Sequence, residues 1–354
     1  MDEMILTKAI DASPQVFRPW RRFWARMFDW WLCGRLWFLL QMVVFNIDAV
    51  TRPATFGRVV IDIVMQIILM LLLEPLFLSR WGTTPGKWLL GLYVTHESGR
   101  KLTYTEALHR TSGVLMSGMG LAIPIYDLVR LYLSYKACAS GLRLSWDDET
   151  AYTLGAENGR QVVFYLGAVL LVIALLLAAR GQAQLPKHRG ELTAVQFVEN
   201  VNKLNDFYDW LPGSYLAENG QWRQKMADAG GSYYAAEPTV NFEFTETDGR
   251  LTEVRFGTDR NYKQHIASNE KQMCLAIMAY AGAQKSIHFW DMFSPWWADL
   301  VAVPFEDFAF TWGGVDVHYE VTYSSYEKVS NFPMLFPKDN GPYHYQMEFV
   351  MSKP

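Results

Sequence analysis

Charged residues are scarce in this 354-residue chain. Asp, Glu, Lys and Arg together make up 19% of it, whereas apolar residues make up 51% and aromatic residues 15%. A soluble globular protein usually carries about 25% charged residues. The shortage of charge argues against an ordinary soluble chain and favours a protein that lies partly in lipid.

Motifs for catalysis and metal binding are also missing. The seven histidines are isolated, with no His-Glu-x-x-His pattern and no zinc-type Cys/His spacing, and no Gly-x-Ser-x-Gly occurs. Of the three cysteines, only Cys274 lies in the second half, so that half cannot form an internal disulfide. We expect no bound metal, no cofactor and no enzymatic activity.

Positive charge is lacking in the second half of the chain. Residues 1–180 hold 18 Lys and Arg against 14 Asp and Glu, whereas residues 181–354 hold 14 against 22, giving net charges of +4 and −8. An acidic region without a basic tract is a poor partner for phosphate backbones. Nucleic acid is therefore excluded as a partner. A cleavable signal peptide is also not expected, because the N-terminus is polar until about Phe23.

Long hydrophobic runs are abundant in the first half. A helix needs about 20 apolar residues to cross a bilayer core. Four segments are candidates for membrane-spanning helices: Met27–Ile47, Val59–Leu78, Ser112–Tyr135 and Val162–Ala179. The third contains Gly118, Gly120 and Pro124, so it either crosses once with a kink or enters and returns as a helical hairpin. The expected fold is an α-helical membrane bundle of about four hydrophobic segments, followed by a soluble α+β domain.

The distribution of Lys and Arg predicts the orientation. The tail 1–26 and the loop 80–111 hold five such residues each, whereas the connection 48–58 holds two. Positive loops stay in the cytoplasm, so we expect the N-terminal tail 1–26 and the 80–111 loop there. The C-terminal domain then lies outside if 112–135 is a hairpin, and inside if that segment crosses once.

The soluble half, 181–354, shows helical and strand patterns. A capping box at Thr193 and Gln196 opens an amphipathic helix, and a second helix is expected at 270–283. Asp248-Gly249 predicts a hairpin turn, and alternation predicts strands at 315–323 and 343–351. The aromatic-rich segment 288–312 is interpreted as core, with a binding groove or membrane-facing surface as the alternative.

Charges inside the hydrophobic runs are candidate functional residues, since each costs a few kcal/mol or more unless paired or hydrated. We consider Asp29, Asp62 and Glu74 as candidate sites for a cation or proton. Arg26 and Asp29 are spaced to pair directly, as are Asp127 and Arg130. Glu74 precedes Pro75 and has no obvious local partner. The simpler interpretation is that each acid neutralises a nearby arginine.

The segment 81–110 is the most distinctive. Its GTTPGKW is not a phosphate-binding loop, because the glycines are one residue too close and Trp88 replaces the hydroxyl residue. Instead, TTPGKWLLGLYVTHESGRKLTYTEALHR, together with RRFWARMFDWWL before it and LSWDDETAYTLG after it, resembles the RDD family of membrane proteins over residues 16–155. The motif residues implied are Arg22, Arg26, Asp29, Pro85, Gly86, Lys87, Gly91, Arg110 and Asp147, with Asp148 as a competing choice for the last.

The resemblance has consequences for organisation and function. It implies a transmembrane domain at 27–160 in the bacterial cell (inner) membrane. The apolar run that follows predicts an additional transmembrane helix at 161–180. The resemblance also implies that Asp147 lies on the side of the Lys87 loop, which favours the hairpin and an extracytoplasmic C-terminal domain. Transport of a small ligand, or exchange of a monovalent cation for protons, is the function that the family implies. The alternative is a membrane-anchored scaffold that presents its acidic C-terminal domain to a protein partner.

Overall fold

The computed structural model describes residues 18–50, 54–147, 150–154, 161–224, 240–293, 295–329, 333–338 and 341–353. The chain divides into two compact units. The membrane unit comprises Met1–Leu40 and Pro53–Leu176, and the C-terminal unit comprises Gln41–Arg52 and Leu177–Pro354.

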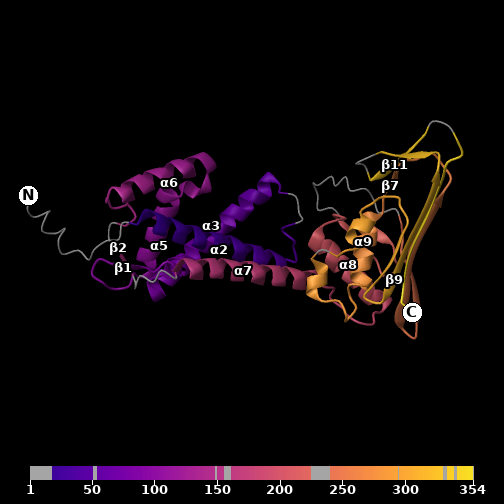
Figure 1. Cartoon of the computed structure of the whole chain (residues 1–354), viewed down its shortest axis with the longest axis horizontal. Coiled ribbons are helices and arrows are strands. Elements are labelled where there is room, and N and C mark those ends of the chain that lie inside the picture. The colour runs from indigo at the N-terminus through magenta and orange to yellow at the C-terminus, as the bar shows by residue number, and fades with distance from the viewer. Residues whose placement is uncertain are drawn as a thin grey trace, which may run out of the picture. The chain divides into compact units, whose positions relative to one another are not determined.

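The membrane unit is helical, with one small sheet (Figure 1). Its helices are α2 (Pro19–Val43), α3 (Phe56–Trp81), α4 (Pro85–Leu89), α5 (Tyr104–Gly113), α6 (Pro124–Ala139) and α7 (Gln161–Gln184), the last of which ends in the C-terminal unit. Strands β1 (Leu92–His96) and β2 (Thr150–Leu154) pair antiparallel, from Leu92 opposite Leu154 to His96 opposite Thr150. This pairing brings together two parts of the chain that flank α5 and α6.

Helices α2 and α3 pack antiparallel. The side chain of Gln66 donates to the carbonyl of Trp30 at 2.6 Å, and the indole of Trp37 donates to Asp62 Oδ1 at 2.7 Å. Helix α7 instead begins beside the start of α2, where the Tyr165 hydroxyl donates to the carbonyl of Trp24 at 3.3 Å. Along α2 the residue numbers rise from Trp30 to Trp37, while those of their partners on α3 fall from Gln66 to Asp62. Helix α3 therefore runs back toward the start of α2.

The segment 112–135 folds back on itself. Helix α5 continues as a π-helix, Val114–Gly118, and a 3₁₀ turn at Gly120–Ala122 leads into α6. Helix α6 has 16 residues, about 24 Å of rise, which is shorter than the bilayer core of about 30 Å. The pairing of β1 with β2 requires the chain to return to its starting side. The hairpin alternative is therefore the one the structure contains.

Two of the described helices, α3 and α7, are long and apolar enough to cross a membrane. None of the most apolar 18-residue window of α7 is buried within the protein. Such a surface is stable in lipid and costly in water. Of the four hydrophobic segments expected, the first forms the charge-bearing helix α2 and the third forms the hairpin, so four long apolar helices are not observed among the described residues.

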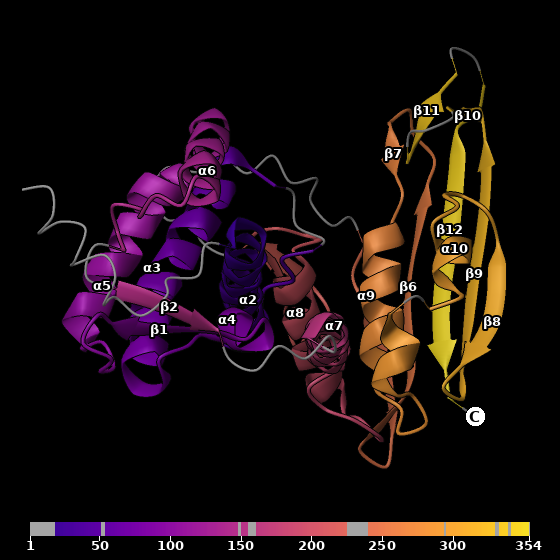
Figure 2. The same ribbon diagram turned by 60° about the vertical axis from the view of Figure 1, so that its left-hand side comes forward.

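The C-terminal unit is an α+β region. Its main sheet is antiparallel with strand order β5-β6-β12-β9-β8. These strands are β5 (Glu243–Thr247), β6 (Arg250–Arg260), β8 (Phe308–Trp312), β9 (Val315–Ser324) and β12 (His344–Ser352). Helices α8 (Ala194–Tyr208) and α9 (Glu270–Tyr280) cover one face of this sheet (Figures 1 and 2).

Smaller elements complete the C-terminal unit. They are the hairpin β3 (Ser214–Leu216) and β4 (Trp222–Gln224), the three-stranded sheet of β7 (Ile266–Ala267), β10 (Tyr326–Lys328) and β11 (Met334–Pro337), the 3₁₀ turn Phe289–Met292, and α10 (Ala298–Val301). In the aromatic segment 288–312, Trp297 and Trp312 are buried and Trp290 and Trp296 are exposed. The segment is therefore partly core and partly surface, so the core interpretation holds for some of its aromatic residues only.

Local sequence signals in this unit are confirmed. The capping box at Thr193 and Gln196 is formed, and Asp248 and Gly249 both have positive φ at the β5–β6 turn. The second helix ends at Tyr280, three residues before its expected end.

The connection that follows α2 packs into the C-terminal unit. The amide of Asp48 donates to the carbonyl of Phe207 at 2.9 Å, and the buried Asp48 carboxylate pairs with Arg180 at 2.9 Å. Arg180 lies near the end of α7. The chain leaving α2 and the chain leaving α7 therefore meet in the same unit.

Candidate functional site

The Thr-Pro-Gly-Lys segment binds the carboxylate of Asp29 on α2. The amide of Gly86 donates to Asp29 Oδ1 at 2.7 Å, the hydroxyl of Thr84 donates to Oδ2 at 2.5 Å, and Lys87 Nζ lies 3.5 Å from Oδ2. Thr84 is also the N-cap of α4, and Pro85 occupies its first turn. This arrangement compensates a buried carboxylate with two hydrogen bonds and one cation.

Gly86 allows this close approach. A Cβ at this position would lie 2.2 Å from the carbonyl oxygen of Ala25 and 3.0 Å from Asp29 Oδ1. Gly91 serves a different purpose, because its φ of +68° makes the turn from α4 into β1. The two family glycines are therefore required by backbone contact and backbone conformation, respectively.

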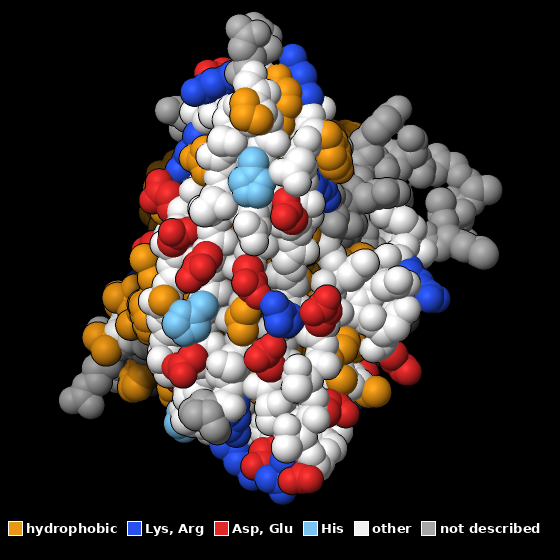
Figure 3. All heavy atoms as spheres, turned by 90° about the vertical axis from the view of Figure 1, so that its right-hand side faces the viewer, with side chains coloured by type: hydrophobic (Ala, Val, Ile, Leu, Met, Phe, Trp, Pro, Cys, Tyr) orange, Lys and Arg blue, Asp and Glu red, His pale blue; other side chains and the backbone are white. Residues whose placement is uncertain are grey.

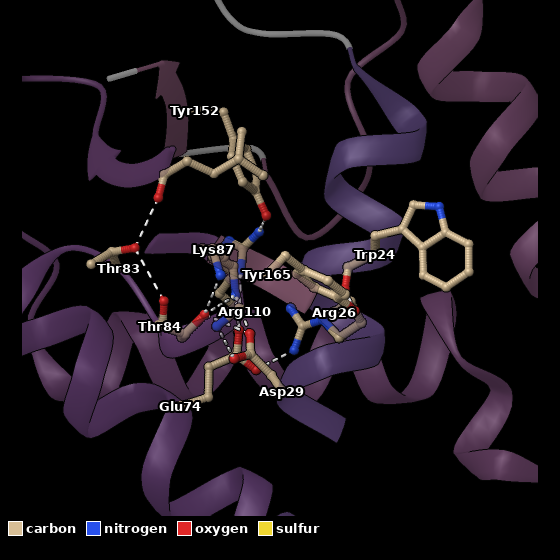
Figure 4. A network of polar contacts seen from close by, with 12 residues as sticks. Trp24, Arg26, Asp29, Glu74, Thr83, Thr84, Lys87, Arg110, Tyr152 and Tyr165 are labelled. Atoms are coloured by element: carbon tan, nitrogen blue, oxygen red, sulfur yellow. Dashed lines mark hydrogen bonds and ion pairs between the residues drawn. The ribbon is translucent and has the colours of Figure 1, made fainter. Parts of the chain in front are cut away.

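Glu74 of α3 has cationic partners on three elements (Figure 4). Arg26 of α2 forms an ion pair with Oε2, Lys87 Nζ lies 2.9 Å from Oε1, and Arg110 Nη1 of α5 lies 3.8 Å from Oε1. Glu74 thus has no partner close to it in sequence, as expected, but it is paired in the folded protein. Its partners are distant in sequence, so the residues around it in α3 could not indicate them.

The expected pairing of Arg26 with Asp29 is also replaced by other pairs. Arg26 forms an ion pair with Glu74 on the neighbouring helix. Asp29 pairs with Lys87 and accepts a hydrogen bond from the start of α4. Likewise, Arg130 donates through Nε to the carbonyl of Ser117 at 2.5 Å, across the helical hairpin. In these cases a cross-helix partner displaces the partner one turn away.

The closing motif residue, Asp147, joins the same cluster. Its carboxylate pairs with Arg110 Nη2 at 2.9 Å and forms a second ion pair with Arg22 of α2. Burial alone would raise the pKa of Asp147, but the charges of Arg110 and Arg22 outweigh burial and hold this pKa below its ordinary value. The competing residue Asp148 lies outside the described residues.

Tyr152 of β2 completes the site and was not singled out by the sequence. Its hydroxyl accepts a hydrogen bond from Arg110 Nη2 at 2.7 Å, and the Arg22 guanidinium lies 4.0 Å from the centre of its ring. It lies in the closing LSWDDETAYTLG element, but a single tyrosine in a strand carries no specific signal. Only the β1–β2 pairing places it against both arginines.

The third proposed ion-site residue, Asp62, lies apart. It accepts from Trp37, and 12 residues of α3, about 18 Å of helical rise, separate it from Glu74. Asp29, Asp62 and Glu74 therefore do not form one site. Within the described ranges, no group of three or more His, Cys, Asp and Glu residues is placed to hold a metal ion.

The assembled cluster carries more positive than negative charge. Its ionised side chains that contact one another are Arg22, Arg26, Lys87, Arg110, Asp29, Glu74 and Asp147. Four are cations and three are anions, which leaves one positive charge in excess. All come from elements of the membrane unit, and all are buried or nearly so.

Two cavities flank this cluster within the membrane unit. The first, about 480 Å³, lies among α2, the π-helix, α6 and the side chains of Leu144, Trp146 and Tyr152. Arg22, Arg26 and Arg110 form part of its wall. The second, about 300 Å³, lies between α2 and α3, and Asp29 and Glu74 form part of its wall. No residue lines both cavities. The Arg26–Glu74 ion pair thus joins the wall of one cavity to the wall of the other.

These features define a helical membrane domain with a buried ionic cluster, joined to a separate α+β region. Residues 17–187 match the model of the RDD family. The chain thus contains an RDD-family domain, and every charged residue of the cluster except Glu74 is a residue of the family motifs. No curated protein matches the chain, and no solved structure matches it.

Proposed function

We propose that the RDD domain transports a small ligand across the bacterial inner membrane and has no enzymatic role. The supporting observation is the pair of cavities separated by the Arg26–Glu74 ion pair. A transporter must hold its ligand at a barrier that opens to one side at a time. Buried ion pairs on different helices suit this role, because they exist in two discrete arrangements, made or broken.

We place the N-terminus and the Lys87 loop in the cytoplasm and the C-terminal unit outside. Helix α2 leads out, α3 returns, the α5–α6 hairpin stays on the inner side, and α7 leads out again. The contacts of Asp48 with Phe207 and Arg180 support this arrangement, because they join the outer end of α2 to the outer end of α7.

The native cysteines allow a test that needs no knowledge of the ligand. Cys138 lines the first cavity and Cys33 lines the second. In sealed vesicles, variants that retain only one of these thiols should each react with an impermeant methanethiosulfonate from one side, and the two sides should be opposite. In the Glu74→Gln background both thiols should become reachable from the same side. Reaction of both from one side in the parent protein would contradict the proposal.

Cation/proton exchange is a narrower version of the same function. Asp29 and Glu74 would have to exchange Lys87 and Arg26 for a monovalent cation or proton. A sodium or potassium gradient imposed on proteoliposomes should then change the internal pH, and Glu74→Gln should abolish that change. If the unmodified protein produces no pH change with either ion, the exchange version is wrong, while the cysteine test still decides transport of a small ligand.

A second candidate function is presentation of the C-terminal unit to a basic protein partner. The sheet face away from α8 and α9 carries many acidic side chains (Figure 3), and on β6 Arg255 contacts Glu243 and Glu348. Glu348 lies directly opposite Glu320 across strands β12 and β9, a like-charge pair that costs stability. A basic side chain of a partner would relieve this repulsion, which favours a role in binding. Glu320→Lys together with Glu348→Lys should abolish capture of the partner and leave vesicle transport unchanged.

A further inference from the structure

The first cavity has an unusual wall for a membrane domain. Apart from its arginines, the wall is mainly apolar and aromatic, with side chains such as Trp20, Phe23, Leu131 and Trp146. Its volume of about 480 Å³ lies within the range of small-molecule sites, roughly 300–1,000 Å³. The cavity therefore fits a mainly apolar molecule that meets charge at one place.

That charge is positive and only partly satisfied. The Arg110 side chain is 2% exposed, and its Nε and Nη1 have no hydrogen-bond partner among the described residues. Its Nη2 is used by Asp147 and Tyr152, and Nη1 lies 3.8 Å from Glu74, beyond hydrogen-bond distance. Buried donors without acceptors are costly. The Arg110 side chain also forms part of the cavity wall, so an anion in the cavity would lie beside a guanidinium whose charge is only partly compensated.

Arg22 adds a second guanidinium at the same wall. It shares the carboxylate of Asp147 with Arg110, and both lie over the ring of Tyr152. One carboxylate thus serves two guanidinium groups. The excess positive charge of the cluster is therefore at least partly located where the cluster faces the first cavity.

We propose that this cavity binds an amphipathic anion, with its acidic group at Arg22 and Arg110 and its apolar part along α6 and the π-helix. The π-helix Val114–Gly118 supports this placement, since single-turn π-helices are frequent at functional sites, and Val114 and Gly118 both line the cavity. The inference names a ligand class for one of the two cavities in the transport proposal and rests on that proposal for the ligand's passage, but not for its binding.

Cys138 provides the measurement. Its Sγ lies 4.0 Å from Arg22 Nη1, so an acid bound at the arginine should cover this thiol. The full-length protein with Cys33→Ser and Cys274→Ser is placed in phosphatidylcholine vesicles, and decanesulfonate is the probe. We expect decanesulfonate to slow modification of Cys138 by at least about tenfold, and decyltrimethylammonium at the same concentration to have little effect. Equal protection by the cationic amphiphile would overturn the proposal.

Cys33 in the second cavity is the matched control. In the variant with Cys138→Ser and Cys274→Ser, decanesulfonate should leave the Cys33 rate unchanged. Equal slowing of both thiols would show general partitioning into the protein and would contradict a specific site. If phosphatidylglycerol vesicles slow Cys138 without added probe, the anion comes from the lipid, whereas an effect of decanesulfonate alone indicates a free ligand.

A binding measurement avoids dependence on thiol reactivity. Leu131 lines the cavity, whereas Leu133 on the same helix is exposed and does not line it. Leu131→Trp fills the site without touching the ion pairs and should weaken equilibrium binding of radiolabelled decanesulfonate at least tenfold. Leu133→Trp should bind like the parent protein. Equal binding by both variants and parent would overturn the proposal, even if the cysteine test showed transport.

Discussion

Arg26 of α2 is ion-paired with Glu74 of α3, 48 positions away along the chain. The pair connects two helices of the membrane unit, and each residue borders a different cavity. Two residues that are remote in sequence thus stabilise the packing of α2 against α3. The family motifs supply the surroundings of this pair: Asp29 with the Thr-Pro-Gly-Lys segment on one side, and Asp147 with two arginines on the other.

The Arg26–Glu74 pair should show strong thermodynamic coupling. Removing one partner leaves a buried charge with fewer compensating partners, which costs about 3–5 kcal/mol. Arg26→Gln and Glu74→Gln should each lower the melting temperature in detergent, and the double variant should lose much less than the sum of the two. Arg26→Gln with Asp29→Asn should be closer to additive, because these residues do not pair. Stronger coupling in the Asp29 cycle would contradict the observed pairing.

Gly86→Ala should destabilise the membrane unit. The added Cβ would meet the Ala25 carbonyl at 2.2 Å, so α4 would have to move away from α2 and loosen its hold on Asp29. Gly167→Ala is the control, because a Cβ there meets nothing within 4 Å and alanine favours a helix by up to about 1 kcal/mol. Membrane accumulation of the two variants measures the contrast. A Gly86→Ala protein as abundant as Gly167→Ala would argue against this contact.

Asp147 should make the stability of the folded protein depend on pH in the acidic range. Because its pKa is lowered in the folded protein, its stabilising effect is complete above its ordinary value of about 3.9 and is lost as pH falls through the lowered pKa. The melting-temperature difference between the parent and Asp147→Asn should stay constant from pH 7 to 5 and narrow only below about pH 4. Glu348→Gln, which removes an exposed ion pair, should differ little from the parent in melting temperature at every pH measured. A difference that already shrinks between pH 7 and 5 would contradict the assignment.

The C-terminal end of the chain should lie outside the cytoplasm. Helix α7 starts beside the start of α2 and its end pairs with Asp48, which follows α2. A reporter that is active only outside the cytoplasm should therefore work when fused after residue 354. The same reporter inserted at Gly99, in the exposed turn after β1, should be inactive. The reverse pattern would invert the topology and leave the fold unchanged.

Hydrophobicity and short-range patterns determined a large part of this protein. The apolar runs of α3 and α7, the capping box at Thr193, the Asp248-Gly249 turn and the alternating strands could all be predicted, because each depends on residues a few positions apart. The family motifs also indicated the charged residues of the site except Glu74, which was singled out by its place in a hydrophobic run, whereas Tyr152 was not predicted. The sequence by itself thus established a membrane domain, a following α+β region and the members of the charged cluster.

Tertiary structure decided how those members are paired. Arg26 and Asp29 are correctly spaced for an ion pair one turn apart, yet each finds a better-placed partner on another element. Glu74 looked isolated because its cations come from α2, α4 and α5, and the choice between a crossing and a hairpin at 112–135 required the β1–β2 pairing. A buried charge in a membrane domain takes whichever opposite charge the packed helices bring closest, because lipid offers no water to solvate it. Proximity of that kind arises only when the helices pack, so no local pattern in the chain records it.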